Sequence, residues 1–415
     1  MESSIHVSEE IRRGRNKLAV TVVGGHAVKH IYNAALQFIL LPVIKVSLGL
    51  TGTQLGALSM SMRITSGVTT MGAGYLGDRF ANHSGLMLAI SLGILGVSFF
   101  LLGSVSNFWF LFAVMLLVGI GPSIYHPPAI AALSRKFPDK RGFAISLHGT
   151  GGSIGNLIGP VLVGALLAGT FYFVMTWQNI LRFSLIPAVI FAVLIYVLMR
   201  NIPAADEGTK SFSDYFSRLF FLVRKRAMIM LVLLTGLRSM GQSAIQTFLP
   251  VYLLEDLGYS EIVVPLYLAG AQAAGIVAQP IMGHLSDRYG RKVVLVPAVV
   301  ALGLLYLGLR FADPGFQLIV IILIMGSFQY SLHSIFIASA MDVAQGESQS
   351  TVVSLIYGAT FFGAFSPIVA GIITDATFTS NAFVYGGIMV LVSALILAMV
   401  KLPKTANQLV ESNDG

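Results

Sequence analysis

The chain alternates long apolar runs with short polar segments over most of its length. Each run has about 20 residues or more, the length that a helix needs to cross about 30 Å of hydrocarbon. Lipid offers no hydrogen-bond partner to a peptide group, so each run is predicted to be a transmembrane helix. The runs occupy residues 19–44, 52–76, 85–104, 108–134, 143–168, 179–200, 227–254, 262–284, 293–311, 316–341, 350–374 and 381–401.

A hydrophilic stretch separates the first six runs from the last six. The pattern therefore predicts an all-α polytopic membrane protein with twelve transmembrane helices in two six-helix repeats. We expect five parts: an N-terminal tail at 1–18, a first bundle at 19–200, a linker at 201–226, a second bundle at 227–401 and a C-terminal tail at 402–415. The N-terminal tail lacks a small-residue cleavage site after a short apolar segment, so we do not interpret it as a removable signal peptide.

Composition excludes a soluble domain. Hydrophobic residues make up 55% of the chain, charged residues 11%, and the mean hydropathy is +0.81. A soluble protein of this composition would expose too much apolar surface. With no cysteine there is neither a disulfide nor a thiolate metal site. We expect no bound metal ion and no cofactor.

The basic residues predict the topology. The net charge is +8, yet most of the 26 Lys and Arg residues lie in the tails and in alternate loops, on one side of a twelve-helix bundle. By the positive-inside rule that side is the cytoplasm. We expect both termini in the cytoplasm, a position in the inner (plasma) membrane surrounded by lipid, and no nucleic-acid partner.

The two halves also resemble each other in sequence. Matched residues recur about half a chain length apart, which is the signature of an internal repeat. Such repeats are typical of transporters whose substrate site lies between two related bundles. Three of the matched pairs are Pro42 with Pro250, His126 with His333 and Pro160 with Pro367.

Three cations lie inside the predicted spans and away from the span ends: Lys29, Arg63 and Arg238. A charge in this position costs roughly 2.5–3.5 kcal/mol or more, so each should face a polar cavity or a partner. Polar side chains accompany them at helical spacing on the first and seventh spans, and Gln272 is the repeat counterpart of Arg63. The further candidates for substrate binding on these two spans are His30, Asn33 and Gln242.

No acidic residue lies near the middle of a span, so the predicted cavity is electropositive. An anionic or acidic substrate is the natural partner, because it can pair with the three cations at close range. His30, His126 and His333 have ordinary pKa values that permit proton exchange near neutral pH. For each histidine, a packing role with a satisfied hydrogen bond remains the alternative.

Two charged loops carry the most specific motif. Residues 283–292 read Gly-x-Leu-x-Asp-Arg-x-Gly-Arg-Lys, and a weaker copy begins half a chain earlier. This motif resembles the signature loop of the major facilitator superfamily of secondary transporters. The resemblance implies the major facilitator fold, alternating access, and a conformational switch in each loop. The switch residues that it marks are Gly74, Asp78, Arg79, Gly283, Asp287, Arg288, Gly290 and Arg291.

The fifth span contains Gly151, Gly155 and Gly159 at intervals of four, followed by Pro160. These glycines form a smooth helix face that favours close packing. The segment also resembles the antiporter signature of the superfamily, although it is one residue longer before its last glycine, Gly164. Plain glycine-mediated packing is the alternative interpretation.

The fourth span contains Tyr125-His126-Pro127 after a glycine-rich turn. This segment resembles the fosmidomycin resistance branch, which exports a phosphonate antibiotic. In the superfamily the fourth helix of each half lines the central path. The resemblance therefore adds Tyr125, His126, Tyr330 and His333 to the candidate substrate-binding residues.

These observations predict a multidrug-resistance type of transporter: a proton-linked exporter or antiporter of a small anionic or acidic compound that acts as a monomer. Proton-coupled uptake of an organic anion is the alternative. An intramembrane enzyme is not expected, because no His-Glu-x-x-His motif, aspartate pair or Ser-His constellation is present.

Overall fold

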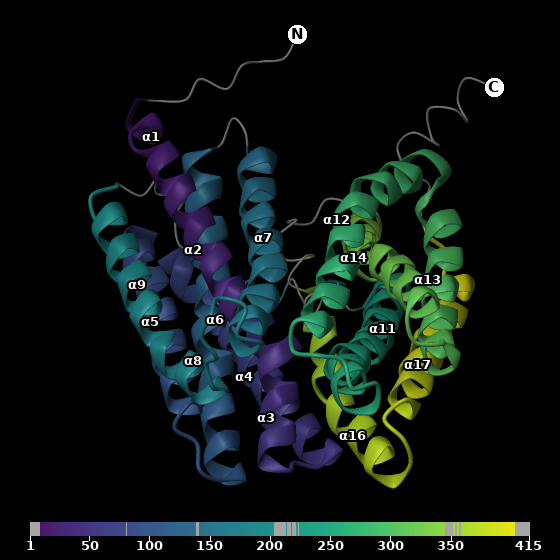
Figure 1. Ribbon diagram of the computed structural model, residues 1–415. Helices are drawn as coiled ribbons and strands as arrows, with labels where there is room; N and C mark the ends of the chain where they lie inside the picture. The colour runs from purple at the N-terminus through teal and green to yellow at the C-terminus, as the bar shows by residue number, and fades with distance from the viewer. Residues whose placement is uncertain are drawn as a thin grey trace, which may run out of the picture. The chain divides into compact units, whose positions relative to one another are not determined.

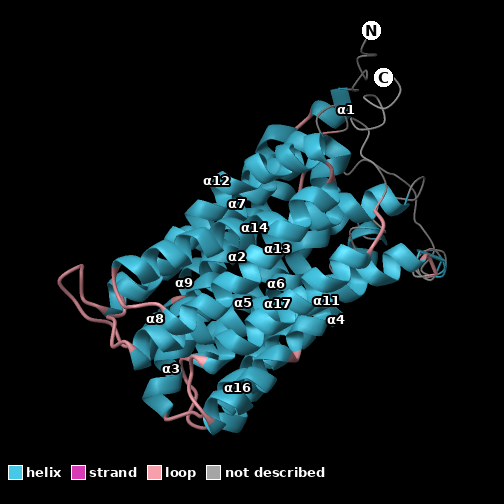
Figure 2. Cartoon of the chain, turned by 90° about the vertical axis from the view of Figure 1, so that its right-hand side faces the viewer, coloured by secondary structure: helices cyan, strands magenta, loops and turns pink. Residues whose placement is uncertain are grey.

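The structure is a computed structural model in which residues 9–79, 81–137, 141–202, 224–344 and 358–402 are described, together with a few single residues between these ranges. Every regular element in this part of the chain is helical, and Figure 2 shows the elements as cyan helices joined by loops. The all-helical prediction from the apolar runs is therefore confirmed.

The first half contains α1 (Glu9–Arg12), α2 (Arg15–Ala35), α3 (Leu41–Leu48), α4 (Gly52–Arg79), α5 (Ser84–Leu102), α6 (Phe108–Lys136), α7 (Arg141–Leu167), α8 (Trp177–Phe183) and α9 (Leu185–Met199). A π-helical turn at Leu36–Leu40 joins α2 to α3, so that Arg15–Leu48 is one candidate span. The helices α8 and α9 together form the sixth predicted span.

The second half contains α11 (Arg226–Val251), a π-helical turn at Tyr252–Asp256, α12 (Val263–Tyr289), α13 (Arg291–Gly308), α14 (Phe316–Ala344), α16 (Ser366–Ala376) and α17 (Asn381–Met399). Within the described residues, ten helices are long and apolar enough to cross a membrane. When the less apolar α4 and the shorter helix Thr360–Ala376 are added, the number of helices is consistent with the predicted twelve.

The chain divides into two compact units. Unit 1 comprises Met1–Val43 and Ser61–Lys210, and unit 2 comprises Ile44–Met60 and Ser211–Gly415. The assignment of Ile44–Met60 to unit 2 follows from contacts at the start of α4. There the Asp375 carboxylate accepts hydrogen bonds from the backbone N–H groups of Gly52 and Thr53, at 2.5 and 2.8 Å. The domain boundaries expected from the sequence remain a prediction.

Glycines bring α7 close to α2 in unit 1, and the two helices run side by side in Figure 1. A methyl group added to Gly151 would lie 2.7 Å from the carbonyl oxygen of Val23. At Gly155 the distance to the carbonyl oxygen of Ala27 would be 2.2 Å, and at Gly159 the distance to the carbonyl oxygen of Ile31 would be 2.3 Å. No side chain larger than hydrogen fits at such a contact, so the glycine face positions α2 on α7.

Small residues play the same part in unit 2, where α11 packs against α16 and α17. The Ser366 hydroxyl donates to the carbonyl oxygen of Met240 at 2.6 Å, and the Ser393 hydroxyl donates to that of Leu234 at 2.8 Å. Gly241 lies against Gly386 with no room for a methyl group. These contacts fix the face of α11 that carries Arg238.

Candidate functional site

Lys29 is the centre of a polar cluster inside unit 1. It lies on α2, and its residue is 3% exposed. Its Nζ atom is 2.5 Å from Nε2 of His126 on α6 and 3.3 Å from Nε2 of His30 on α2. The structure thus brings together Lys29, His30 and His126, three residues expected from the sequence to bind substrate.

Two more histidines complete the cluster. His26 lies one turn before His30, and its ring stacks on that of His148 from α7, with 3.6 Å between centroids. Nδ1 of His26 is 2.7 Å from the carbonyl oxygen of His148. Because a carbonyl oxygen only accepts, Nδ1 is the donor, and neutral His26 presents a lone pair at Nε2. That Nε2 atom is buried without a hydrogen-bond partner in the described structure.

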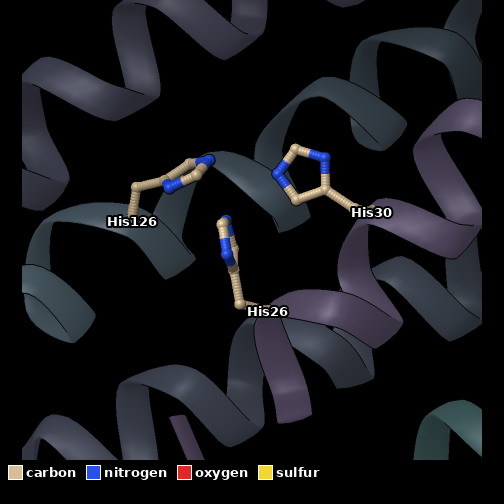
Figure 3. A group of neighbouring side chains, drawn as sticks. All are labelled: His26, His30 and His126. Carbon is tan, nitrogen blue, oxygen red and sulfur yellow. The ribbon is translucent and has the colours of Figure 1, made fainter. Parts of the chain in front are cut away.

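His30 is held in a similar way. Its Nδ1 atom lies 2.8 Å from Oδ1 of Asn156 on α7. With the amide in this orientation, Nδ1 donates and Nε2 is free to accept from Lys29. Figure 3 shows the rings of His26, His30 and His126 turned toward one another, with a nitrogen of each facing the space between them. The cluster therefore presents imidazole lone pairs to its centre.

Tyr125 borders this cluster, whereas Asn33 and Arg63 are further polar residues of unit 1. The Tyr125 hydroxyl donates to the carbonyl oxygen of Val22 at 2.9 Å, and the residue is fully buried. This contact ties α6 to α2. Asn33 is half-buried on α2, and its Oδ1 atom has no hydrogen-bond partner in the described structure. Arg63 is half-buried on α4.

Arg238 is the corresponding feature of unit 2. It lies on α11 and is 2% exposed. One guanidinium nitrogen donates to Oε1 of Gln242 at 2.8 Å, and the guanidinium carbon lies 5.2 Å from the ring centroid of Phe336 on α14. A guanidinium has five N–H donors. Contact with one aromatic face and one amide uses only some of them.

The remaining candidates of unit 2 lie on α12 and α14. Gln272 is buried, and its Oε1 atom has no hydrogen-bond partner among the described residues. Tyr330 and His333 are half-buried on α14. The Tyr330 side chain packs on Gly275 of α12 so closely that a methyl group there would lie 2.5 Å from it.

Lys29 and Arg238 occupy equivalent places in the two repeats, because they lie half a chain apart in the same register as the two signature loops. Within the described residues, the recorded contacts of both cations are with neutral side chains, and neither has a carboxylate partner. A buried cation without a counter-charge is costly to keep in a protein. Each unit therefore contains a buried cation that has no carboxylate partner among the described residues, Lys29 in unit 1 and Arg238 in unit 2.

The second signature loop is organised by Arg291. Its Nε atom donates to Asp342 on α14 at 2.9 Å, and another nitrogen donates to the Ser286 hydroxyl at 2.8 Å and pairs with Asp287. Gly290 has φ 100°, a conformation that favours glycine, and it separates α12 from α13. The loop thus links the ends of three helices.

The other predicted switch residues lie at the edge of the second signature loop or outside the residues that the structure describes. Arg288 is exposed and packs over the ring of its neighbour Tyr289. Gly283 is half-buried with open space beside it. The side chains of the first loop at Gly74, Asp78 and Arg79 lie outside the described residues.

Sequence reasoning missed two members of the histidine cluster. His26 belongs to the polar stripe of the first span, yet it was not among the candidate site residues. His148 opens the glycine-rich helix and reaches the cluster because α7 packs closely on α2. Helical spacing could have indicated His26, whereas the contribution of His148 depends on packing between helices.

A polytopic helical protein made of two repeated units, with a buried cation in each, has the architecture of a secondary transporter. The family model of the Major Facilitator Superfamily matches residues 30–278 and 231–414, and the chain belongs to this superfamily. Its relatives are transporters, so the chain is a multi-pass membrane transporter and not an enzyme.

Curated relatives cover most of the chain. The Fosmidomycin resistance protein of Escherichia coli (strain K12) is 23% identical over 366 residues, which are 86% of this chain and 87% of the relative. The uncharacterised MFS-type transporter YfnC of Bacillus subtilis (strain 168) is 25% identical and covers 84% and 85%. The resemblance to the fosmidomycin resistance branch is thereby confirmed.

Solved structures support the fold. The nucleoside transporter NupG is similar to this chain with a TM-score of 0.73 at 15% identity, over 92% of this chain and 98% of that one. A bacterial homologue of the human lysosomal transporter Spinster, in an inward-facing and unoccupied conformation, gives the same TM-score and identity over 95% and 96%. At this identity the likeness establishes the major facilitator fold alone.

Proposed function

We propose that this protein is a secondary active transporter that exports a small anionic or acidic compound by alternating access, linked to the movement of protons. The observation that carries the proposal is the pair of buried cations, Lys29 and Arg238, at equivalent positions of the two repeats without a carboxylate partner in the described structure. Either charge would repel a cationic drug, whereas an anion bound at either residue would relieve the cost of burying that charge.

The donors that these cations retain favour an oxyanion. A lysine ammonium has three N–H donors, and two of those on Lys29 are directed at His30 and His126. Arg238 uses one of its five donors on Gln242. The remaining N–H groups can form charge-assisted hydrogen bonds with a carboxylate or phosphonate, which are roughly twice as strong as neutral ones.

The names of relatives agree with export of a drug-like compound. One is a fosmidomycin resistance protein, and several others are multidrug resistance proteins called MdtG. For proton coupling we propose the candidates His30, His126 and His333. The proposed topology keeps both termini in the cytoplasm of a cell whose inner (plasma) membrane holds the protein, as a monomer.

Thermal-shift titration of the purified protein with anionic compounds tests this proposal. We expect a phosphonate or carboxylate substrate to raise the unfolding temperature of the wild type. Arg238→Ala, Arg63→Ala and Lys29→Met should remain folded and lose this shift, because each removes a charge that attracts the anion. Arg200→Gln is the matched control, since it removes an exposed cation at the end of α9.

The control should retain the full ligand-induced shift. If Lys29→Met and Arg238→Ala both respond to the anion as the wild type does, these residues do not bind the substrate. A wild-type protein that responds to cationic compounds and ignores anions would contradict the proposed substrate class.

A further inference from the structure

We propose that His26, His30 and His126 form a binding site for a divalent transition-metal ion of the kind that prefers imidazole, with Zn²⁺ as the leading example. The site goes beyond the proposed anion transport and lies wholly within unit 1. In the metal-free protein, the Nζ atom of Lys29 lies next to two of the three rings, those of His30 and His126.

The first support is the convergence of three ligand atoms. One nitrogen from each of the three imidazoles lies within 4.8 Å of the other two. His26 and His30 are one helical turn apart on α2 and share a face, while His126 comes from α6. Figure 3 shows the three rings around a common space. Three imidazoles from two helices match the His₃ ligand set of catalytic zinc sites, which leave a fourth position open.

The second support is the way the rings are held. Nδ1 of His26 donates to the carbonyl oxygen of His148, and Nδ1 of His30 donates to Oδ1 of Asn156. Histidine ligands of metals almost always give their other ring N–H to an oxygen acceptor of this kind, which fixes the tautomer and the ring orientation. Both rings are therefore set to offer Nε2, and Nε2 of His26 is buried without a partner in the described structure.

The third support is Lys29. Its Nζ atom lies 2.5 Å from Nε2 of His126 and 3.3 Å from Nε2 of His30. An ammonium group can only donate, so these two nitrogens accept hydrogen bonds. Two of the three imidazole lone pairs are thus directed at a cationic group, as they would be at a metal ion.

Metal binding requires a small closure of the cluster. Zinc–imidazole distances of about 2.0–2.1 Å place tetrahedral ligands about 3.4 Å apart. The nitrogen separations, all within 4.8 Å, must therefore shrink by at most about 1.4 Å, and Lys29 must withdraw. The flexible four-carbon stem of lysine permits this movement.

Ligand chemistry selects the metal class. The cluster offers imidazole nitrogens, and the chain contains no cysteine. Imidazole suits Zn²⁺, Ni²⁺, Cu²⁺ and related ions, whereas Mg²⁺ and Ca²⁺ prefer oxygen ligands. A bound ion would link α2 to α6, so it should also stabilise unit 1 against thermal unfolding.

Metal titration of the full-length protein, purified without a polyhistidine tag, tests this inference. Zn²⁺ binding is measured by calorimetry, and Co²⁺ binding by the visible absorption that reports the number and geometry of ligands. We expect one high-affinity site per chain. His126→Ala should lose it, and His126→Gln serves as a second variant if the first does not fold.

Two further variants separate a metal site from a packed histidine cluster. Lys29→Met removes the competing ammonium group, so Zn²⁺ affinity should rise at least tenfold. Asn156→Leu removes the acceptor that orients His30, and affinity should fall by about 10–100-fold. His284→Ala changes an exposed histidine of α12 and should leave binding unchanged.

The inference is overturned if His126→Ala and His126→Gln bind Zn²⁺ as tightly as the wild type, or if Lys29→Met weakens binding. The same Lys29→Met protein should lose its response to anions. Failure of the anion proposal and failure of the metal proposal therefore give different results in a single variant.

Discussion

Replacing Gly155 by alanine tests how closely α2 and α7 must pack. A methyl group at this position would lie 2.2 Å from the carbonyl oxygen of Ala27, 2.7 Å from Cβ of His30 and 3.0 Å from the backbone nitrogen of Ile31. Ordinary van der Waals contact begins at 3.4 Å. Backbone atoms cannot rotate aside as a side chain can, so the two helices would have to separate by about 1 Å.

The expected free-energy change combines two opposing effects. Overpacking a close-packed interface costs about 1–3 kcal/mol, and the contacts with backbone atoms place Gly155→Ala toward the upper end. Alanine gains about 1 kcal/mol over glycine in helix propensity. We therefore expect a net destabilisation of about 2 kcal/mol. The histidine cluster should also be disturbed, because His30 is among the atoms that must move.

Gly149→Ala is the matched control on the same helix. Gly149 is exposed and has no neighbouring atom within 4 Å of the added methyl group. This variant gains helix propensity without a clash, so its unfolding temperature should equal or exceed that of the wild type. Thermal unfolding of both purified proteins in one detergent gives the comparison. If Gly155→Ala is as stable as Gly149→Ala, the proposed glycine contact between α2 and α7 is wrong.

Three further tests address the loops and helix ends. Asp287→Asn should weaken the pairing with Arg291 and shift the protein toward its inward-facing state, with a larger effect than Asp78→Asn in the degenerate first loop; unchanged spectroscopic distances across the predicted cytoplasmic face in both variants would refute this role. Asp375→Ala should lower the unfolding temperature, because it removes the acceptor of two N–H groups at the start of α4, and an unaltered temperature would contradict that capping role. A double-mutant cycle on Lys45 and Glu255, whose side chains are 14% and 31% exposed, should give a coupling of about 0.2–1 kcal/mol; zero coupling would show that the pair does not contribute to stability.

The transmembrane architecture was predictable because hydrocarbon imposes a simple rule on the sequence. A run long enough to cross the membrane must satisfy its backbone internally, and the apolar runs at 85–104 and 316–341 accordingly correspond to α5 and α14. The break at Gly290 was also readable, since a polar loop with glycine marks the end of a span. These features depend on local sequence and on the solvent.

Interruptions inside the spans were not predictable from the apolar pattern. The π-helical turn at Leu36–Leu40 joins two helices that read as one continuous run. The eleventh span contains a tight helical turn at Thr360–Ala364 before α16 begins. Both lie inside predicted apolar runs, 19–44 and 350–374, that continue past them without a break, so the pattern carried no signal for them.

The binding candidates were only partly predictable, because the sequence shows which residues are charged but does not show which helices pack together. Lys29 and Arg238 stand out because a charge inside an apolar run is expensive wherever the helix lies. The stacking of His148 on His26 and the pairing of Arg291 with Asp342 depend on which helices pack together. A single amino-acid sequence does not give the distances between residues on different helices.

Counterflow in proteoliposomes tests the central claim of anion transport most directly. Vesicles containing the protein are loaded with unlabelled compound, and entry of labelled phosphonates, carboxylates and size-matched cations is measured with and without a pH gradient. We predict that an anionic compound shows counterflow and that the pH gradient drives its net movement in the direction of export. Lys29→Met and Arg238→Ala should abolish both. Counterflow of cations alone, or anion counterflow that persists in both variants, would contradict the account.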